Sequence, residues 1–166
     1  MKRISSLFLS SLLALILILS GCAGKEQKTE KQTGNQSTSV EKISDNILDE
    51  MEGPPKNGHT IERHVGKSEE DLKNRLKTDK YYDKETATKA VKDSLKQHDK
   101  EIQDWLKNSK EARLVLNTTH SFPVGKTVIK KNMNVKDKLV KTVTVLARDK
   151  SGDLGYKIIT SYPSDK

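Results

Sequence analysis

The distribution of apolar residues divides the chain into an apolar start, a polar stretch and a longer region with regular patterns. Residues 7–19 are mostly apolar, whereas residues 23–42 are dominated by Lys, Glu, Gln, Thr and Ser. Such a polar stretch cannot bury enough apolar surface to fold, so residues 22–56 are predicted to be a flexible tether. It includes a short helix at 43–51, which ends before the Gly-Pro-Pro at 53–55. Residues 57–166 are long enough for one small domain.

The first half of this domain has a helical pattern. Ser68 is followed three positions later by Asp71, which resembles a capping box and predicts a helix that continues to residue 77. Asp83 begins a second helical segment, which the pattern allows to be one long helix or two helices separated near His98. Its apolar residues recur at three- and four-residue spacing: Ala87, Val91, Leu95, Ile102, Trp105 and Leu106.

The second half is rich in β-branched residues and predicts strands. The predicted strands cover residues 112–122, 126–135, 139–149 and 156–163, and turns at 123–126 and 150–155 separate them. Helices followed by a run of antiparallel strands indicate an α+β domain. Strict alternation in the last strand places Tyr156, Ile158, Thr160 and Tyr162 on one face.

The apolar start has the pattern of an export signal. Lys2 and Arg3 precede an apolar run that is shorter than the roughly 20 residues of a membrane-spanning helix. The run ends in Leu-Ser-Gly-Cys at 19–22, which resembles the lipobox of bacterial lipoproteins. The resemblance implies a signal peptide at 1–21, lipidation of Cys22 and an exported protein that is anchored to the cell membrane and faces outward. The alternatives are a plain signal peptide and an uncleaved membrane anchor.

The cysteine content bears on how the domain is stabilised, and the net charge bears on what it binds. Cys22 is the only cysteine, so the domain is expected to be held together by its core without disulfides. Loss of Lys2 and Arg3 with the signal peptide lowers the 31 basic side chains to 29, against 23 acidic ones, a net charge of +6. This balance suits a polyanion such as nucleic acid or anionic lipid.

Two histidines lie close together at the start of the domain. His59 and His64 are five positions apart and point about 140° apart on a helix, which is poor geometry for one metal ion, so no metal site is predicted. His64 and Arg75 share a face only if one helix continues between them. Gly66 and the cap at Ser68 predict a break instead. By pattern alone, both residues are ordinary structural or solvated side chains.

Two further polar groups are candidates by their chemistry. The hydroxyls of Thr160 and Tyr162 are two positions apart on a predicted strand, where the ordinary interpretation is a half-buried face with polar groups near the sheet edge. His120 is a candidate acid or base, and a plain strand histidine is its alternative.

Several motifs together resemble one family. They are Gly-His-Thr at 58–60, His-Val-Gly at 64–66, the spaced Leu72, Arg75 and Leu76, the segment 103–109 and Thr-x-Tyr-Pro at 160–163. They resemble the bacterial RNase A-like toxin domain of contact-dependent inhibition proteins and related polymorphic toxins, over residues 58–163. The resemblance implies a twisted antiparallel sheet as in RNase A, without disulfides, and RNA cleavage that needs no metal or other cofactor. We expect a monomer.

The resemblance also implies site residues. The catalytic residues would be His64, Arg75, Thr160 and Tyr162, with His59 in support. RNA carries its own nucleophile, the 2′-hydroxyl, which DNA lacks. A histidine exchanges protons near neutral pH, and an arginine offers phosphate a planar fork of donors. The hydroxyls of Thr160 and Tyr162 would orient a base or phosphate, or assist the leaving oxygen.

The setting differs from that of the family. Its toxins end large delivery proteins, and a cognate immunity protein usually accompanies them, whereas this chain begins with a lipoprotein signal. The substrate is therefore open: external RNA, the RNA of a neighbouring cell in contact, or none. In the last case the chain is a non-catalytic envelope lipoprotein that uses the scaffold to bind a polyanion or a protein.

Overall fold

The computed structural model describes residues 43–74 and 79–166. The predicted export signal, Cys22 and most of the predicted tether lie outside these residues, and so does Arg75. Within the described parts of the chain, none of the helices is long and apolar enough to span a membrane.

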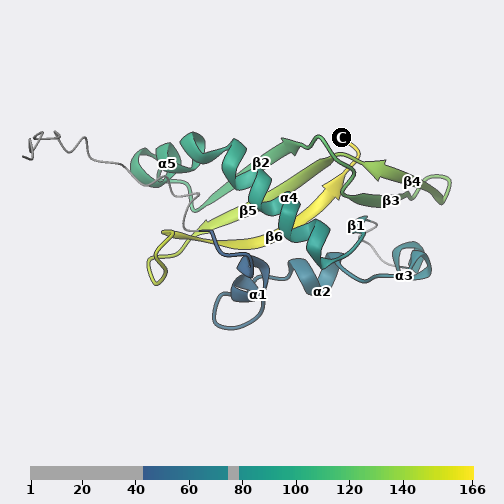
Figure 1. Ribbon diagram of the computed structural model, residues 1–166, viewed down its shortest axis with the longest axis horizontal. Helices are drawn as coiled ribbons and strands as arrows, with labels where there is room; N and C mark the ends of the chain where they lie inside the picture. The colour runs from purple at the N-terminus through teal and green to yellow at the C-terminus, as the bar shows by residue number, and fades with distance from the viewer. Residues whose placement is uncertain (1–42, 75–78) are drawn as a thin grey trace, which may run out of the picture. The chain divides into compact units, whose positions relative to one another are not determined.

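The described residues form five helices and six strands, shown in Figure 1. The helices are α1 (Ile47–Met51), α2 (Thr60–His64), α3 (Glu69–Asn74), α4 (Lys84–Gln97) and α5 (Asp99–Asn108). The strands are β1 (Asp79–Tyr81), β2 (Arg113–Thr119), β3 (Gly125–Ile129), β4 (Asn134–Leu139), β5 (Lys141–Arg148) and β6 (Tyr156–Ser164). The predicted α+β class is confirmed.

The predicted helix starts are confirmed by their caps. The backbone N–H of Ser68 donates to Asp71 Oδ2 and the backbone N–H of Asp71 donates to Ser68 Oγ, each at 3.0 Å, which is a reciprocal capping arrangement. The carboxylate of Asp83 accepts from the backbone N–H of Thr86 at 2.7 Å and begins α4. The helical segment that follows is two helices, with His98 between them.

The strands form two antiparallel sheets of three strands each, in the orders β1-β3-β4 and β2-β5-β6. The strand predicted at 126–135 is in fact the turn between β3 and β4 together with parts of both strands. Met133, with φ of 58°, lies in this turn. β1 was not predicted, because three residues are too few to show alternation.

The core lies between α4 and the β2-β5-β6 sheet, which this helix crosses in Figure 1. Ala87, Ala90, Val91 and Leu95 of α4 are fully buried. The core also includes Ile43, Ile47, Leu48 and Met51. The folded domain therefore begins earlier than the boundary at residue 57 that was expected from the polar composition of the tether.

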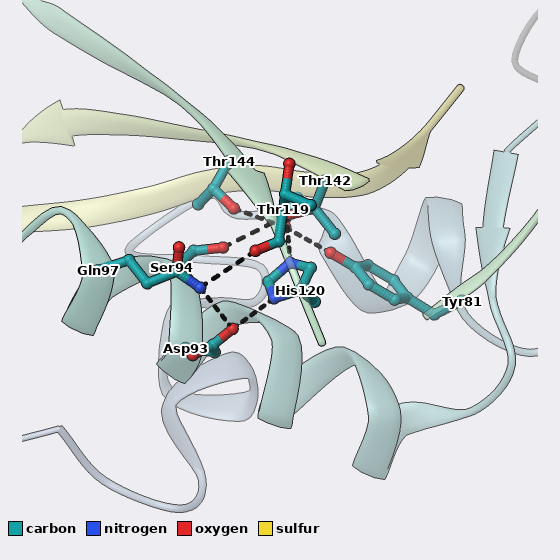
Figure 2. A network of polar contacts seen from close by, with 9 residues as sticks. Tyr81, Asp93, Ser94, Gln97, Thr119, His120, Thr142 and Thr144 are labelled. Carbon is teal, nitrogen blue, oxygen red and sulfur yellow. Dashed lines mark hydrogen bonds and ion pairs between the residues drawn. The ribbon is translucent and has the colours of Figure 1, made fainter. Parts of the chain in front are cut away.

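A polar network crosses this core and is drawn in Figure 2. His120 Nδ1–H donates to Asp93 Oδ2 at 2.6 Å, and its Nε2 lies 2.9 Å from the hydroxyl of Thr142. The hydroxyls of Tyr81 and Ser161 are hydrogen bonded at 2.6 Å, and Ser161 is also bonded to Thr144 at 2.8 Å. Both nitrogens of the buried His120 ring thus have partners within the fold. This favours the interpretation of His120 as a structural histidine over that of an acid or base.

We expect the Tyr81→Phe variant to lose about 1 kcal/mol of unfolding free energy, because a buried hydrogen bond to Ser161 is removed. Ser161 keeps its bond to Thr144, so the loss stays small. Denaturant unfolding measures it, and Tyr82→Phe is the matched control, since the Tyr82 side chain lies at the surface. An equal loss in both variants would contradict the assignment of this bond to the core.

Candidate active site

A bulge in β6 decides which way its hydroxyls point. Val145 pairs with Thr160, but the next residue of β5, Leu146, pairs with Ile158, so Ile159 is an extra residue. Neighbouring residues of β5 point to opposite faces, and therefore Thr160 and Ile158 also do. The predicted single face is wrong: Tyr156 and Ile158 point into the core, whereas Thr160 and Tyr162 point to the other face.

The start of α2 binds to β6 at this bulge. The backbone N–H of His59, the N-cap residue of α2, donates to the carbonyl oxygen of Ile159 at 3.0 Å. The backbone N–H of Ser161 donates to the hydroxyl of Thr60 at 2.9 Å. A Cβ at Gly58 would lie 2.8 Å from the carbonyl oxygen of Ile158, so a side chain would prevent this close approach. The Gly-His-Thr motif therefore fixes α2 against β6.

His64 is the last residue of α2, and the chain then leaves the helix at Gly66, whose φ is +68°. This confirms the predicted break before α3. The His64 side chain is completely buried. Its Nδ1 lies 3.2 Å from the carbonyl oxygen of Asp79 and 2.9 Å from Asp79 Oδ2. The contact with Oδ2 has ion-pair distance without hydrogen-bond alignment, since Oδ2 has no hydrogen-bond partner among the described residues.

Tyr162 lies against His64, with 5.3 Å between the ring centroids and 32° between the ring planes. Partial burial, together with the negative charge of Asp79, raises the pKa of the Tyr162 phenol above its ordinary value. The phenol is therefore protonated at neutral pH and can donate a hydrogen bond.

Three buried polar atoms of the site residues have no hydrogen-bond partner among the described residues, namely His64 Nε2, Asp79 Oδ2 and Thr160 Oγ1. A buried polar atom without a partner costs about 1–3 kcal/mol, and native structures hold few of them. Asp79 Oδ2 faces His64 Nδ1, and the other two atoms, on the neighbouring elements α2 and β6, indicate groups that are available to a ligand.

A groove of about 630 Å³ is lined by Asp79 and Tyr162, and its volume is within the usual range for ligand sites. It lies where the two sheets meet, because β1 and β3 contact β6. Its lining residues come from both sheets and the chain end: Asp79, Asn117, Thr127, Val143, Tyr162, Pro163, Ser164, Asp165 and Lys166. A larger groove of about 750 Å³ follows α5, but none of the predicted site residues lines it.

The structure thus brings together His64, Thr160 and Tyr162 of the predicted site, and it adds Asp79. Asp79 could not be predicted from the sequence, because its strand is short and its contact with His64 spans fifteen residues. Arg75 lies outside the described residues, four positions before Asp79 in the chain. No cluster of three or more metal-ligating side chains occurs in the described ranges 43–74 and 79–166.

Two comparisons with known proteins found a match. The family model described as the bacterial CdiA-CT RNAse A domain matches residues 58–163. The crystal structure of a CdiA-CT/CdiI complex from Y. kristensenii 33638 contains a similar chain, with 30% sequence identity and a TM-score of 0.59. The similarity covers 64% of this chain and 99% of that one. None of the curated proteins matches.

Proposed function

Because the chain belongs to the family of the bacterial CdiA-CT RNAse A domain and is therefore a ribonuclease, we propose that it cleaves RNA by attack of the 2′-hydroxyl on the adjacent phosphate. His64, Arg75, Thr160 and Tyr162 are the proposed catalytic residues. One observation carries the proposal: His64, whose buried Nε2 has no hydrogen-bond partner among the described residues, packs against Tyr162, and Tyr162 lines the groove.

His64 is the proposed general base. Its Nε2 takes the proton of the 2′-hydroxyl while a bond forms between O2′ and phosphorus. The bond from phosphorus to O5′ breaks, which leaves a 2′,3′-cyclic phosphate and a free 5′-hydroxyl. RNA in the groove reaches Nε2 when the ring of Tyr162 turns aside, since His64 is completely buried next to it.

Tyr162 is the proposed donor to the leaving oxygen. Its phenol is protonated at neutral pH and lines the groove, so it can supply the proton that O5′ gains. The proton on His64 then returns to Tyr162 through water, and no net charge is gained. Thr160, whose hydroxyl has no hydrogen-bond partner among the described residues, is proposed to hydrogen bond a base or phosphate of the substrate.

Arg75 is proposed to stabilise the charge on phosphorus. Its guanidinium stays protonated and presents parallel N–H donors to two phosphate oxygens. With this charge supplied by a side chain and the protons moved by His64 and Tyr162, the mechanism has no step that requires a metal ion. His59 supports the site by fixing the start of α2 on β6.

The location and partners of the enzyme are also proposals. The lipobox-like sequence before Cys22 supports an exported protein that is anchored to the cell membrane by lipid and faces outward. The net positive charge supports an RNA substrate. The similar chain from Y. kristensenii 33638 is in complex with CdiI, which supports a cognate immunity protein as the partner of this chain and a role as a toxin.

One experiment tests the reaction. Residues 23–166, which retain every described residue, are incubated in EDTA with a labelled RNA and with the DNA of the same sequence. We expect the RNA to be cut to products with a 2′,3′-cyclic phosphate and the DNA to stay intact, because it has no 2′-hydroxyl. Inhibition by EDTA would contradict the metal-free mechanism.

A non-catalytic binding module is the second candidate, and the complete burial of His64 favours it. Absence of cleavage by a folded protein that retains RNA would support this candidate. Retention is measured by the change in fluorescence anisotropy of the labelled RNA.

A further inference from the structure

We propose that Asp79 is a positioning residue: its carbonyl oxygen accepts the hydrogen of His64 Nδ1 and its carboxylate lies at ion-pair distance from the same nitrogen, so that Nε2 is the nitrogen that accepts the proton. This inference rests on the proposed function of the same site.

The contacts of Nδ1 determine where the ring carries its proton. A backbone carbonyl oxygen can only accept a hydrogen bond, and so can a carboxylate. Nδ1 faces one oxygen of each kind, both from Asp79, at 3.2 and 2.9 Å. The neutral ring of His64 therefore keeps its hydrogen on Nδ1 and its lone pair on Nε2, which has no partner among the described residues.

The carboxylate has a second effect during the reaction. When Nε2 takes the proton of the 2′-hydroxyl, the buried ring becomes positively charged. An isolated charge in a buried position is costly, and a neighbouring opposite charge offsets much of that cost. Asp79 Oδ2 is already at ion-pair distance from the ring, so the compensating charge needs no rearrangement.

The fold holds Asp79 in this place. Asp79 is the first residue of β1 and pairs with Thr127 of β3. Two positions later, the buried Tyr81 is hydrogen bonded to Ser161 of β6 at 2.6 Å. Lys80 lies between them and donates to the carbonyl oxygen of Lys67. Strand β1 is thus attached to both sheets, and these contacts fix the position of Asp79 beside His64.

A direct role in binding the substrate is less compatible with the charges. Asp79 also lines the groove, and its side chain is 18% exposed. A carboxylate facing the groove would repel the phosphates of RNA unless a positive charge neutralised it. Among the described residues, the titratable groups in contact with His64 are Asp79 of β1 and Tyr162 of β6. His64 is therefore the partner of this carboxylate.

The activity test compares Asp79→Asn with the wild type across pH. We expect kcat to fall about 10²-fold with little change in KM, since the compensating charge is lost but the carbonyl oxygen stays. The acid limb of the profile should move to lower pH, because the protonated ring loses its negative neighbour and gives up its proton more easily. Asp137→Asn, on β4 of the same sheet, is the matched control and should leave the profile unchanged. An unchanged profile in Asp79→Asn would overturn the proposal.

A second measurement needs neither activity nor a variant. The ¹⁵N shifts of the His64 ring in the wild-type protein, above the pH at which the ring loses its charge, should show hydrogen on Nδ1 and a lone pair on Nε2. Hydrogen on Nε2 would overturn the proposal, even if Asp79→Asn fails to fold. The expected shifts in a protein that cleaves no RNA would uphold the positioning by Asp79 and refute the proposed ribonuclease reaction.

Discussion

The His64→Ala variant should cleave RNA about 10³-fold more slowly than the wild type, or not measurably. The substitution removes the base that takes the proton of the 2′-hydroxyl, and general base catalysis contributes about 10²–10⁴-fold to rates of this kind. Nε2 has no other function in the described structure, since it makes no hydrogen bond there. The loss should therefore appear in the single-turnover rate constant for cleavage, measured with saturating enzyme.

Folding must be separated from chemistry in this variant. His64 is fully buried against Tyr162, so alanine leaves a cavity and deprives Asp79 of its partner. His64→Gln retains more volume and a polar group but provides no base, and should be equally inactive with a smaller loss of thermal stability. His98→Ala is the histidine control, because His98 pairs with Glu101 between α4 and α5, away from the site residues. Full activity in His64→Gln would exclude His64 as the base.

The second large effect is expected at Arg75. Arg75→Lys keeps the positive charge but loses the planar fork, and we expect kcat/KM to fall about 10²-fold, because loss of one donor to a developing charge costs about 10²–10³-fold. Arg75→Ala should be slower still. The measurement is the initial rate on a short labelled RNA at two salt concentrations, which separates loss of a specific contact from loss of general attraction.

The matched control for Arg75 is Arg113→Lys, an exposed arginine on β2 that does not line the groove beside His64. It should retain wild-type kcat/KM at both salt concentrations. If Arg75→Lys were as active as Arg113→Lys, one positive charge would suffice, and the planar guanidinium of Arg75 would not be required. If Arg75→Ala were also fully active, Arg75 would have no part in the reaction.

The candidate site depends on how α2 and β6 are joined. The bulge at Ile159 turns Thr160 and Tyr162 away from the core, and the same Ile159 offers its carbonyl oxygen to His59 at the start of α2. One irregularity in the sheet thus orients two site residues and also positions the helix that ends in His64. Bulges are frequent beside active sites for this reason.

Patterns along the chain were sufficient to predict the local features. The caps at Ser68 and Asp83 were predictable because each involves residues only three positions apart. The α+β class was predictable from the change between helical spacing and β-branched alternation. The motifs that contain His64, Thr160 and Tyr162 identified the family, which the match over residues 58–163 confirms. The roles of these residues in catalysis remain proposals.

Features that depend on pairing between distant segments became visible only in the folded domain. Strict alternation put Thr160 on the same face as Ile158, but the register of β5 against β6 admits an extra residue that no local pattern shows. Composition also places Ile43 in a polar tether. The four apolar residues Ile43, Ile47, Leu48 and Met51 are interspersed with polar ones along the chain, and they join the core only after folding. Asp79 acquires its significance from a contact of 2.9 Å with His64, which exists only once β1 lies beside α2. Spacing along the chain sets local geometry, whereas the site is assembled by contacts between segments that folding alone brings together.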